Sequence, residues 1–248
     1  MTQTRISLWT GPRCVSSAMM YAFAQRSDTR VLDEPLYPHY LRMTGASHPS
    51  REMVMAYMET DSQKVINRQI LGNSDHEVLF IKNLSHHLVG LDVSFVEQLT
   101  NVFLIRNPED MLASLIHYIP APRLLDTAYR MQYRLFHHLK RTGKTPLVID
   151  AKQLLAHPEA TLRLICDHAG IAFDPAMLTW NPGPIPECGV WAEQWYKETH
   201  KHAGFMPYHK SPEPLPEELQ PLVDECFRYY SELYEYAVNP ISEIMVHS

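Results

Sequence analysis

The fold is decided by residues 5–26, RISLWTGPRCVSSAMMYAFAQR, near the start of the chain. Arg5–Trp9 has the composition of a β-strand, and Ser16–Arg26 is predicted to be a helix. The loop between them contains Gly11 and Pro12, two residues that favour a tight turn. A strand, a tight loop and a helix in this order direct backbone N–H groups and the positive end of the helix dipole toward one point, which suits a phosphate group.

Strands and helices continue to alternate in the sequence that follows. We predict further strands at Arg30–Asp33, Val78–Lys82, Val102–Ile105 and Leu147–Asp150. We predict helices at Ser50–Leu71, Asp110–Tyr118, Leu124–Arg141 and Glu159–Ala169. This alternation indicates an α/β fold of three layers, in which helices flank both faces of a central, mostly parallel sheet.

The last part of the chain has a different character. Nine prolines lie between residues 175 and 221, with Trp180, Trp191 and Trp195 among them. We predict an irregular lid there, followed by a final helix at Glu217–Ala237. We expect one domain over residues 1–248, with an α/β core at 1–170 and a C-terminal extension at 171–248 packed over the sheet.

The composition is that of a folded globular protein. Of the 248 residues, 45% are hydrophobic and 20% are charged. The 22 Lys and Arg residues against 28 Asp and Glu give a net charge of −6, the wrong sign for general binding to nucleic acid or to an anionic membrane. No apolar run approaches the ~18 residues that a membrane helix needs. We expect neither partner, and the sequence leaves the oligomeric state open.

The start of the chain and its cysteines both favour a cytoplasmic protein. The chain enters its first strand at once, which leaves no room for a signal peptide. The four cysteines form no CxxC pair, so reduced structural thiols are expected. The histidine pairs at 137–138 and 200–202 lack the further ligands of a known metal motif, and we expect no metal.

The loop after the first strand carries side chains that suit an anion. Arg13 can add a bidentate cationic contact, and the hydroxyls of Ser16 and Ser17 can donate at the start of the helix. Gly11 is not followed by the Gly-Lys-Ser/Thr ending of a Walker A loop, which argues against a magnesium–nucleotide cradle. An N-capped helix with a solvated arginine also explains this segment.

A second candidate lies at the end of the strand Val102–Ile105. Arg106 follows this strand directly, in the crevice where open α/β sheets bind ligands, and Ser114 lies about two turns along the next helix. The two side chains can grip one anionic group. Alternatively, Arg106 pairs with Glu109 or Asp110 at the surface.

Three segments together resemble the sulfotransferase family. Residues 12–17, PRCVSS, resemble its 5′-phosphosulfate loop in the form with arginine in place of lysine. Residues 106–114, RNPEDMLAS, are similar to its 3′-phosphate motif, and residues 33–37, DEPLY, resemble a Glu-Pro element after the second strand. More narrowly, the chain is similar to bacterial sulfotransferase-like proteins with a Gly-Pro-Arg loop.

The resemblance implies a P-loop-type fold and the co-substrate 3′-phosphoadenosine 5′-phosphosulfate (PAPS), with a hydroxyl or amine of a small molecule as acceptor. The implied nucleotide-binding residues are Gly11, Pro12, Arg13, Cys14, Val15, Ser16, Ser17, Arg106 and Ser114. The product adenosine 3′,5′-bisphosphate would be held by the same groups.

Sulfuryl transfer needs a cation for the leaving phosphate and a base for the acceptor proton. Arg13 is the first candidate for the cation, and Lys82 is the second. The base is Glu34, one of the pair His86 and His87, or neither of these, and the sequence leaves this choice open.

The chain departs from the family pattern in three places. Val15 stands where most members have glycine, the histidines follow Lys82 later than in the family's Lys-x-His pattern, and the late Arg-Lys-Gly segment is missing. These departures keep open a nucleotide-binding module without turnover. A kinase that uses a nucleoside triphosphate is a further alternative.

Overall fold

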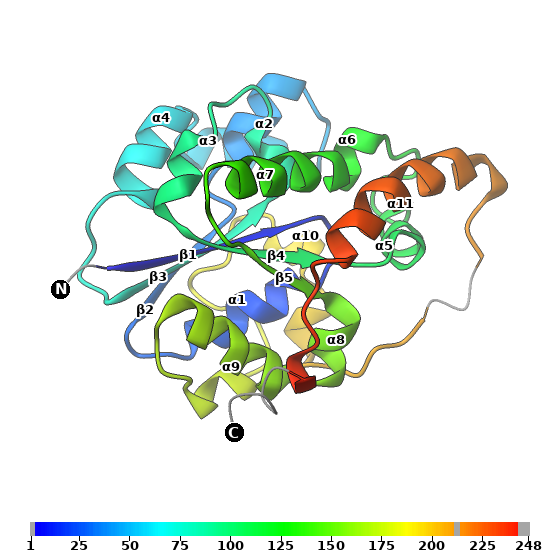
Figure 1. Cartoon of the computed structure of the whole chain (residues 1–248). Helices are drawn as coiled ribbons and strands as arrows, with labels where there is room; N and C mark the ends of the chain where they lie inside the picture. Colours follow the sequence, from blue (N-terminus) through cyan, green and yellow to red (C-terminus); the bar gives the residue numbers. More distant parts are fainter. Residues whose placement is uncertain (1–2, 211–213, 243–248) are drawn as a thin grey trace.

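The structure, a computed structural model, describes residues 3–210 and 214–242. Five strands form one parallel sheet in the order β2-β3-β1-β4-β5 (Figure 1). Their bounds are β1 Thr4–Thr10, β2 Thr29–Asp33, β3 Val78–Leu84, β4 Thr100–Ile105 and β5 Leu147–Asp150. Each of these strands was predicted from the sequence, and the predicted α/β fold with a parallel sheet is confirmed.

Both faces of the sheet are apolar. Successive residues of a strand point to opposite faces, so Val102 and Leu104 of β4 pack in one buried cluster while Phe103 and Ile105 pack in the other. A parallel sheet with two apolar faces needs cover on both of them. This requirement explains why helices follow almost every strand.

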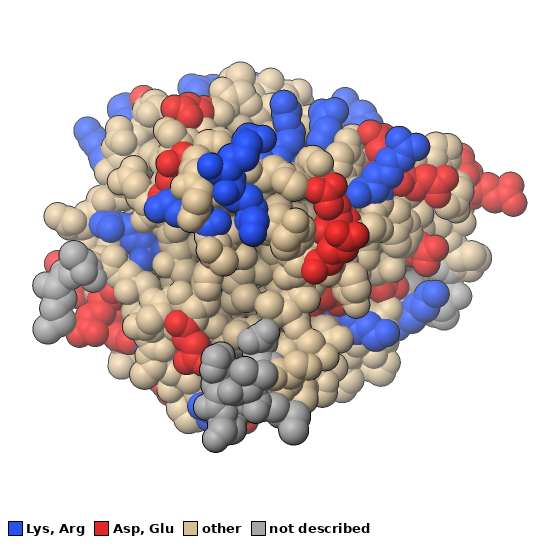
Figure 2. Space-filling view, viewed as in Figure 1, with Lys and Arg blue, Asp and Glu red and all other residues tan. Residues whose placement is uncertain are grey.

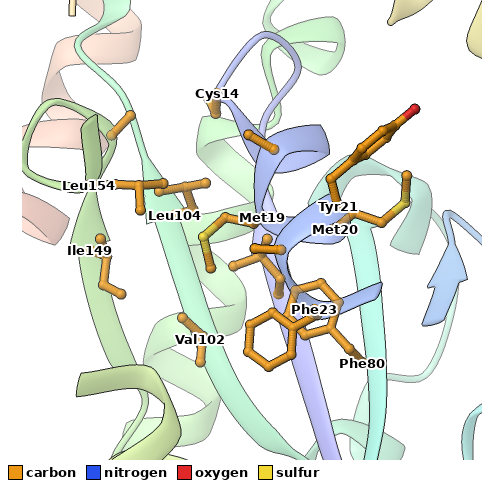
Figure 3. Close-up of a cluster of buried hydrophobic side chains, with 14 of the residues drawn as sticks. Cys14, Met19, Met20, Tyr21, Phe23, Phe80, Val102, Leu104, Ile149 and Leu154 are labelled. Carbon is orange, nitrogen blue, oxygen red and sulfur yellow. The ribbon is translucent and has the colours of Figure 1, made fainter. Parts of the chain in front are cut away.

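Helices α1, α8 and α9 cover one face of the sheet, and α7 and α11 cover the other (Figure 1). Their bounds are α1 Ser16–Ala24, α8 Ala151–Ala156, α9 Pro158–Ala169, α7 Tyr129–Arg141 and α11 Gln220–Tyr234. Figure 3 shows Met19 and Phe23 of α1 within the apolar cluster on the first face.

Shorter elements complete the fold. The remaining α-helices are α2 Tyr37–Thr44, α3 Arg51–Tyr57, α4 Ser62–Val65, α5 Pro108–Leu115, α6 Leu124–Thr127 and α10 Ala192–Trp195. The 3₁₀ turns are η2 Ser85–Leu88, η3 Ser94–Gln98, η4 Pro175–Leu178, η5 Thr199–Lys201 and η6 Glu217–Leu219, and η1 Ile66–Ile70 is a π-helix. Among the helices in the described ranges, none is both long and apolar enough to cross a membrane.

The prediction of one long helix at Ser50–Leu71 is wrong. Helix α3 ends before Met58, whose backbone is extended (φ −110°, ψ 154°). The chain restarts at Asp61, whose carboxylate accepts hydrogen bonds from the N–H groups of Gln63 and Lys64 and caps α4. An aspartate with this preference for the N-cap therefore divides the segment.

The predicted helix Leu124–Arg141 is also divided. Ala128 adopts a left-handed conformation (φ 69°) between α6 and α7. This conformation costs an alanine about 1–2 kcal/mol relative to the right-handed one, so it has to be held by its surroundings. The final helix also differs from Glu217–Ala237, because its first turn is the 3₁₀ turn η6.

The extension beyond residue 170 folds back over the carboxyl edge of the sheet. It contains short turns and α10 as far as residue 210, in agreement with the irregular segment that its prolines predict. Trp180 and Trp191 are buried in the main apolar cluster. Gly189 donates its backbone N–H to Asp33 at the end of β2 (2.9 Å).

The apolar contact between α1 and β3 yields the first prediction. The rings of Phe23 and Phe80 are fully buried and stacked, with centroids 3.9 Å apart and planes 10° apart. Phe80→Ala should lower the free energy of unfolding by about 3–5 kcal/mol, because it removes this contact and leaves a cavity. Denaturant unfolding measures the loss, and Phe80→Leu should retain most of the stability. A loss under about 1 kcal/mol for Phe80→Ala would contradict this packing.

Candidate functional site

The carboxyl ends of four strands meet around one cavity. The loop after β1, Glu34 after β2, the end of β3 and Arg106 after β4 all contribute to its wall. The predicted site residues that line it are Pro12, Arg13, Cys14, Val15, Ser16, Ser17, Glu34, Lys82, His86, His87 and Arg106. Of the other two, Gly11 is buried next to Cys14 and Ser114 contacts Arg13.

The loop after β1 is tightly constrained. A side chain at position 11 would lie 2.9 Å from the carbonyl oxygen of Thr127, so only glycine allows this approach. Arg13 (φ 56°) and Val15 (φ 64°) both have left-handed backbone conformations. A β-branched residue rarely adopts this conformation, and Val15 does so directly before α1 begins. Val15 therefore takes a conformation that glycine adopts without steric cost.

The first turn of α1 faces the cavity through Ser16 and Ser17. No side chain among the described residues caps this turn, and the turn contains no acidic residue. Its N–H groups and the positive end of the helix dipole are therefore available to an anion. Burial raises the pKa of the Cys14 thiol to about 11, so this loop residue stays protonated and neutral.

The two predicted anion-binding segments lie in direct contact. Arg13 donates from Nε to the Ser114 hydroxyl (2.9 Å), and Arg106 donates to the carbonyl oxygen of Arg13. Asp110 instead accepts from Tyr208 (2.6 Å), and no ion pair joins Arg106 to Glu109 or Asp110 among the residues with described positions. The alternative of a surface ion pair for Arg106 is thus not observed.

The C-terminal extension forms a hydrogen bond with the guanidinium group of Arg13. It donates to the carbonyl oxygen of Trp195 (3.0 Å) and lies over the ring of Tyr118, 4.6 Å from its centroid. Trp195 in turn stacks on Tyr118, with centroids 5.0 Å apart. The extension therefore contributes to an aromatic cover over the loop after β1.

Lys82 forms the centre of a buried polar cluster. Its ammonium group is 1% exposed and donates to Asp33 (3.0 Å), to Glu34 and to the hydroxyl of Tyr196. These three bonds use all three donors of the group. Tyr196 donates to Asp33 (2.8 Å), and Trp191 donates to the oxygen of Tyr196 (3.1 Å). The cluster therefore joins β2, β3 and the C-terminal extension.

The charges in this cluster shift its pKa values. Burial disfavours the charge of Lys82, but the carboxylates of Asp33 and Glu34 outweigh it and raise the pKa of Lys82. Burial raises the pKa of Glu34, although Lys82 opposes this shift. Glu34 is thus a stronger base than an exposed glutamate and lies on the cavity wall.

His86 and His87 are buried in the 3₁₀ turn η2. Burial lowers the pKa of His86 to about 3 and that of His87 well below its usual value, so both rings are neutral. The His87 ring stacks on Tyr37, with centroids 4.9 Å apart. Within the described ranges, both of its nitrogens lack a hydrogen-bond partner.

Several wall residues were not predicted as site residues. They are Tyr37, His48, Asp126, Trp191, Trp195, Tyr196, Glu198 and Thr199. The sequence did indicate an aromatic group around Trp191 and Trp195. Nothing in it distinguished His48, which bonds to the hydroxyl of Tyr37 (3.1 Å), or Asp126, which lies in a segment predicted to be an ordinary helix.

The histidine pair at 137–138 lies outside the cavity and has acidic partners. His137 pairs with Glu232 (2.6 Å), and His138 pairs with Glu97 (2.9 Å). In the part of the chain that the structure describes, no three histidine, cysteine or acidic side chains come together as metal ligands would.

Comparison with solved structures relates the fold to known proteins. The sulfotransferase from Alicyclobacillus acidocaldarius aligns over 96% of this chain and 98% of its own, with a TM-score of 0.58 and 11% identity. The sulfotransferase domain from the curacin biosynthetic pathway aligns over 90% of this chain and 97% of its own, with a TM-score of 0.54 and 14% identity. At these sequence identities, the comparison shows a shared fold and nothing further.

Comparison of sequences identifies the family. The branched-chain-amino-acid aminotransferase-like protein 1 of Arabidopsis thaliana is 38% identical over 229 residues, which are 92% of this chain. The chain spans 41% of the length of that relative. A model described as a sulfotransferase domain matches residues 4–234. Because this match includes all five strands and the segment that covers them, the chain belongs to the sulfotransferase domain family.

Proposed function

We propose that the chain transfers the sulfuryl group of PAPS to a hydroxyl or amine of a small molecule. One observation carries the proposal: Arg13, Arg106 and Ser114 are in contact although Arg13 precedes the other two by more than 90 residues. A cluster of two guanidinium groups and a hydroxyl beside the free N-terminus of α1 suits a ligand with two anionic groups. PAPS carries such groups at its 5′ and 3′ positions.

The residues fit the two ends of this donor. The loop of residues 11–17 and the first turn of α1 would hold the 5′-phosphosulfate, and Arg106 with Ser114 would hold the 3′-phosphate. Arg13 would exchange its bonds to Ser114 and Trp195 for bonds to the donor. The aromatic rings of the extension would then exclude water from the reacting groups.

Transfer would proceed by in-line attack on sulfur. The acceptor oxygen or nitrogen forms a bond to sulfur while the bond from sulfur to the bridging phosphate oxygen breaks. The acceptor proton passes to a base, and adenosine 3′,5′-bisphosphate leaves with the negative charge of the broken bond. Arg13 faces the phosphate on which this charge grows, and we assign it to the leaving group. Lys82 already uses its three donors, so we assign it to holding Glu34.

Glu34 is the proposed base. A base needs a pKa near the working pH, and burial moves Glu34 upward toward that range but moves His86 downward to about 3. The ion pair with Lys82 fixes the position of the carboxylate. His87 has two buried nitrogens without partners in the described part of the chain, so we propose that it donates a hydrogen bond to the acceptor or the sulfuryl oxygens.

Donor recognition is tested by thermal unfolding with nucleotides. Adenosine 3′,5′-bisphosphate at about 100 times its Kd should stabilise the protein by about 2.7 kcal/mol, or roughly 5–10 °C. Adenosine 5′-monophosphate and ATP should stabilise it less. Arg106→Ala should remove most of the advantage of the bisphosphate over the monophosphate. Equal stabilisation by all three nucleotides, or an equal loss for both in the variant, would refute the assignment.

Arg13→Ala should lower both donor affinity and turnover, because the charge that Arg13 meets grows in the transition state. The expected loss in kcat is roughly 10²–10³-fold, as for other preorganised donors to a developing anion. Steady-state kinetics with a sulfated-product assay measures both parameters, and Arg13→Lys should recover part of kcat. A loss confined to KM would assign Arg13 to binding alone.

Glu34→Gln should reduce kcat by roughly 10²–10⁴-fold and leave the Kd for adenosine 3′,5′-bisphosphate almost unchanged. Because the ionised carboxylate is the active form, the wild-type rate should fall as the pH drops through the raised pKa of Glu34. The residual rate of the variant should lack this fall. His87→Gln is the matched comparison, and a larger kcat loss there than in Glu34→Gln would move the base to the histidines.

A further inference from the structure

A second cavity adjoins the site through His86. It is lined by His86, Val89, Gly90, Leu124, Leu125, Ala128, Arg130, Met131 and Arg134, and its volume is about 150 Å³. His86 is the one residue that lines both this cavity and the site, and its Nδ1 is buried without a partner among the described residues. The ring of His86 thus separates the proposed reaction centre from a second space that lies beside α7.

The left-handed residue Ala128 lines this second space. It lies between α6 and α7, and Leu124 and Leu125 of α6 line the same cavity as Arg130 and Arg134 of α7. A buried alanine held at φ 69° costs free energy, and such residues concentrate at functional sites. Leu124 and Leu125 give the cavity an apolar wall. The exposed side chains of Arg130 and Arg134 line it as well, and we call this part of the cavity its cationic mouth.

The cationic mouth extends along α7. Arg130, Arg134 and Arg141 lie on one face of this helix at steps of four and seven residues, and all three are exposed. In Figure 2 blue side chains gather over the front of the molecule, where Figure 1 places α7. A third cavity of about 320 Å³ shares Gly90, Met131 and Arg134 with the second one and continues to Arg141.

These arginines have no ion-pair partner among the described residues, although Glu97 pairs with His138, which lines the third cavity. In the described part of the chain, no aspartate or glutamate lines the second or the third cavity. None of the three arginines forms an ion pair with another described residue. Although the net charge of the chain is −6, a run of unpaired cations beside an apolar cavity suits an anionic ligand.

We propose that the acceptor carries an anionic group, which binds to Arg130 and Arg134, and an apolar segment, which lies against Leu124 and Leu125. Its hydroxyl or amine then lies at the ring of His86, which has to turn aside for the acceptor to reach the proposed base Glu34. The ligand class is therefore an apolar alcohol or amine with a carboxylate or phosphate at the opposite end. This inference rests on the proposed function for the reaction, but the anion site stands on its own contacts.

Binding of paired probes tests the proposal. 10-Hydroxydecanoate and 1,10-decanediol have the same length and differ in one charge, and calorimetric titration gives the Kd of each. The acid should bind about five to ten times more tightly than the diol, as expected for two partly exposed charge contacts. The double variant Arg130→Gln/Arg134→Gln should remove this preference. Arg30→Gln, at an exposed arginine on β2, is the matched control and should keep it.

Two further measurements complete the test. Leu125→Trp fills the apolar part of the second cavity and should weaken the binding of both probes. The thermal midpoint of the variant checks that it folds. Equal affinity for acid and diol in the wild type, or an unchanged preference in the double variant, would overturn the anion site. An unchanged affinity for the diol in Leu125→Trp would contradict the proposal that the apolar segment of the acceptor lies in the second cavity.

Adenosine 3′,5′-bisphosphate is titrated in the same wild-type and double-variant samples, because it separates the two proposals. Bisphosphate binding without an acid preference rejects only the acceptor class. An arginine-dependent acid preference in a protein that does not bind the bisphosphate rejects the donor and supports the anion site.

Discussion

The site depends on one buried charge, the ammonium group of Lys82. A lysine in the core is tolerated only if its charge is neutralised and its three donors are satisfied, and here Asp33, Glu34 and Tyr196 satisfy them. Asp33 ends β2, Glu34 follows it directly, and Tyr196 lies in the C-terminal extension, whereas Lys82 itself is in β3. The requirement to satisfy one cation therefore fixes the edge of the sheet and also the segment that closes over it.

Strained backbone conformations occur in the wall of the cavity that Lys82 also lines. Arg13, Val15 and Glu34 all have left-handed conformations, and all three line the cavity. Each costs free energy that the surrounding contacts must supply, such as the bond from the Glu34 N–H to the carbonyl oxygen of Lys82 (2.8 Å). In return, the side chains of Arg13 and Glu34 point into the space between the strand ends rather than along the strands.

The sequence predicted the parts of the fold that depend on local patterns. The five strands are short apolar runs, and the loop of residues 11–17 directly follows the first of them, so position along the chain was sufficient. The break after α3 did have a local signal, the N-cap residue Asp61, which the apolar pattern of Ser50–Leu71 outweighed in the prediction. The break at Ala128 was not predictable in this way, because its surroundings hold a left-handed conformation that local propensity disfavours. His48 and Asp126 were missed for the same reason, since only long-range contacts bring them to the cavity.

The donor-binding and acceptor-binding parts of the proposed site differ in how far local sequence patterns predict them. The donor side is built at strand ends, where position along the sheet determines geometry, and it therefore leaves a readable motif. The acceptor side is built from α6, α7 and the extension, whose arrangement depends on the break at Ala128 and on aromatic packing. Because the net charge is −6, long-range attraction gives an anion little help, and binding has to rely on the arginines that line the cavities. Selectivity among acceptors is then a matter of short-range fit along α7.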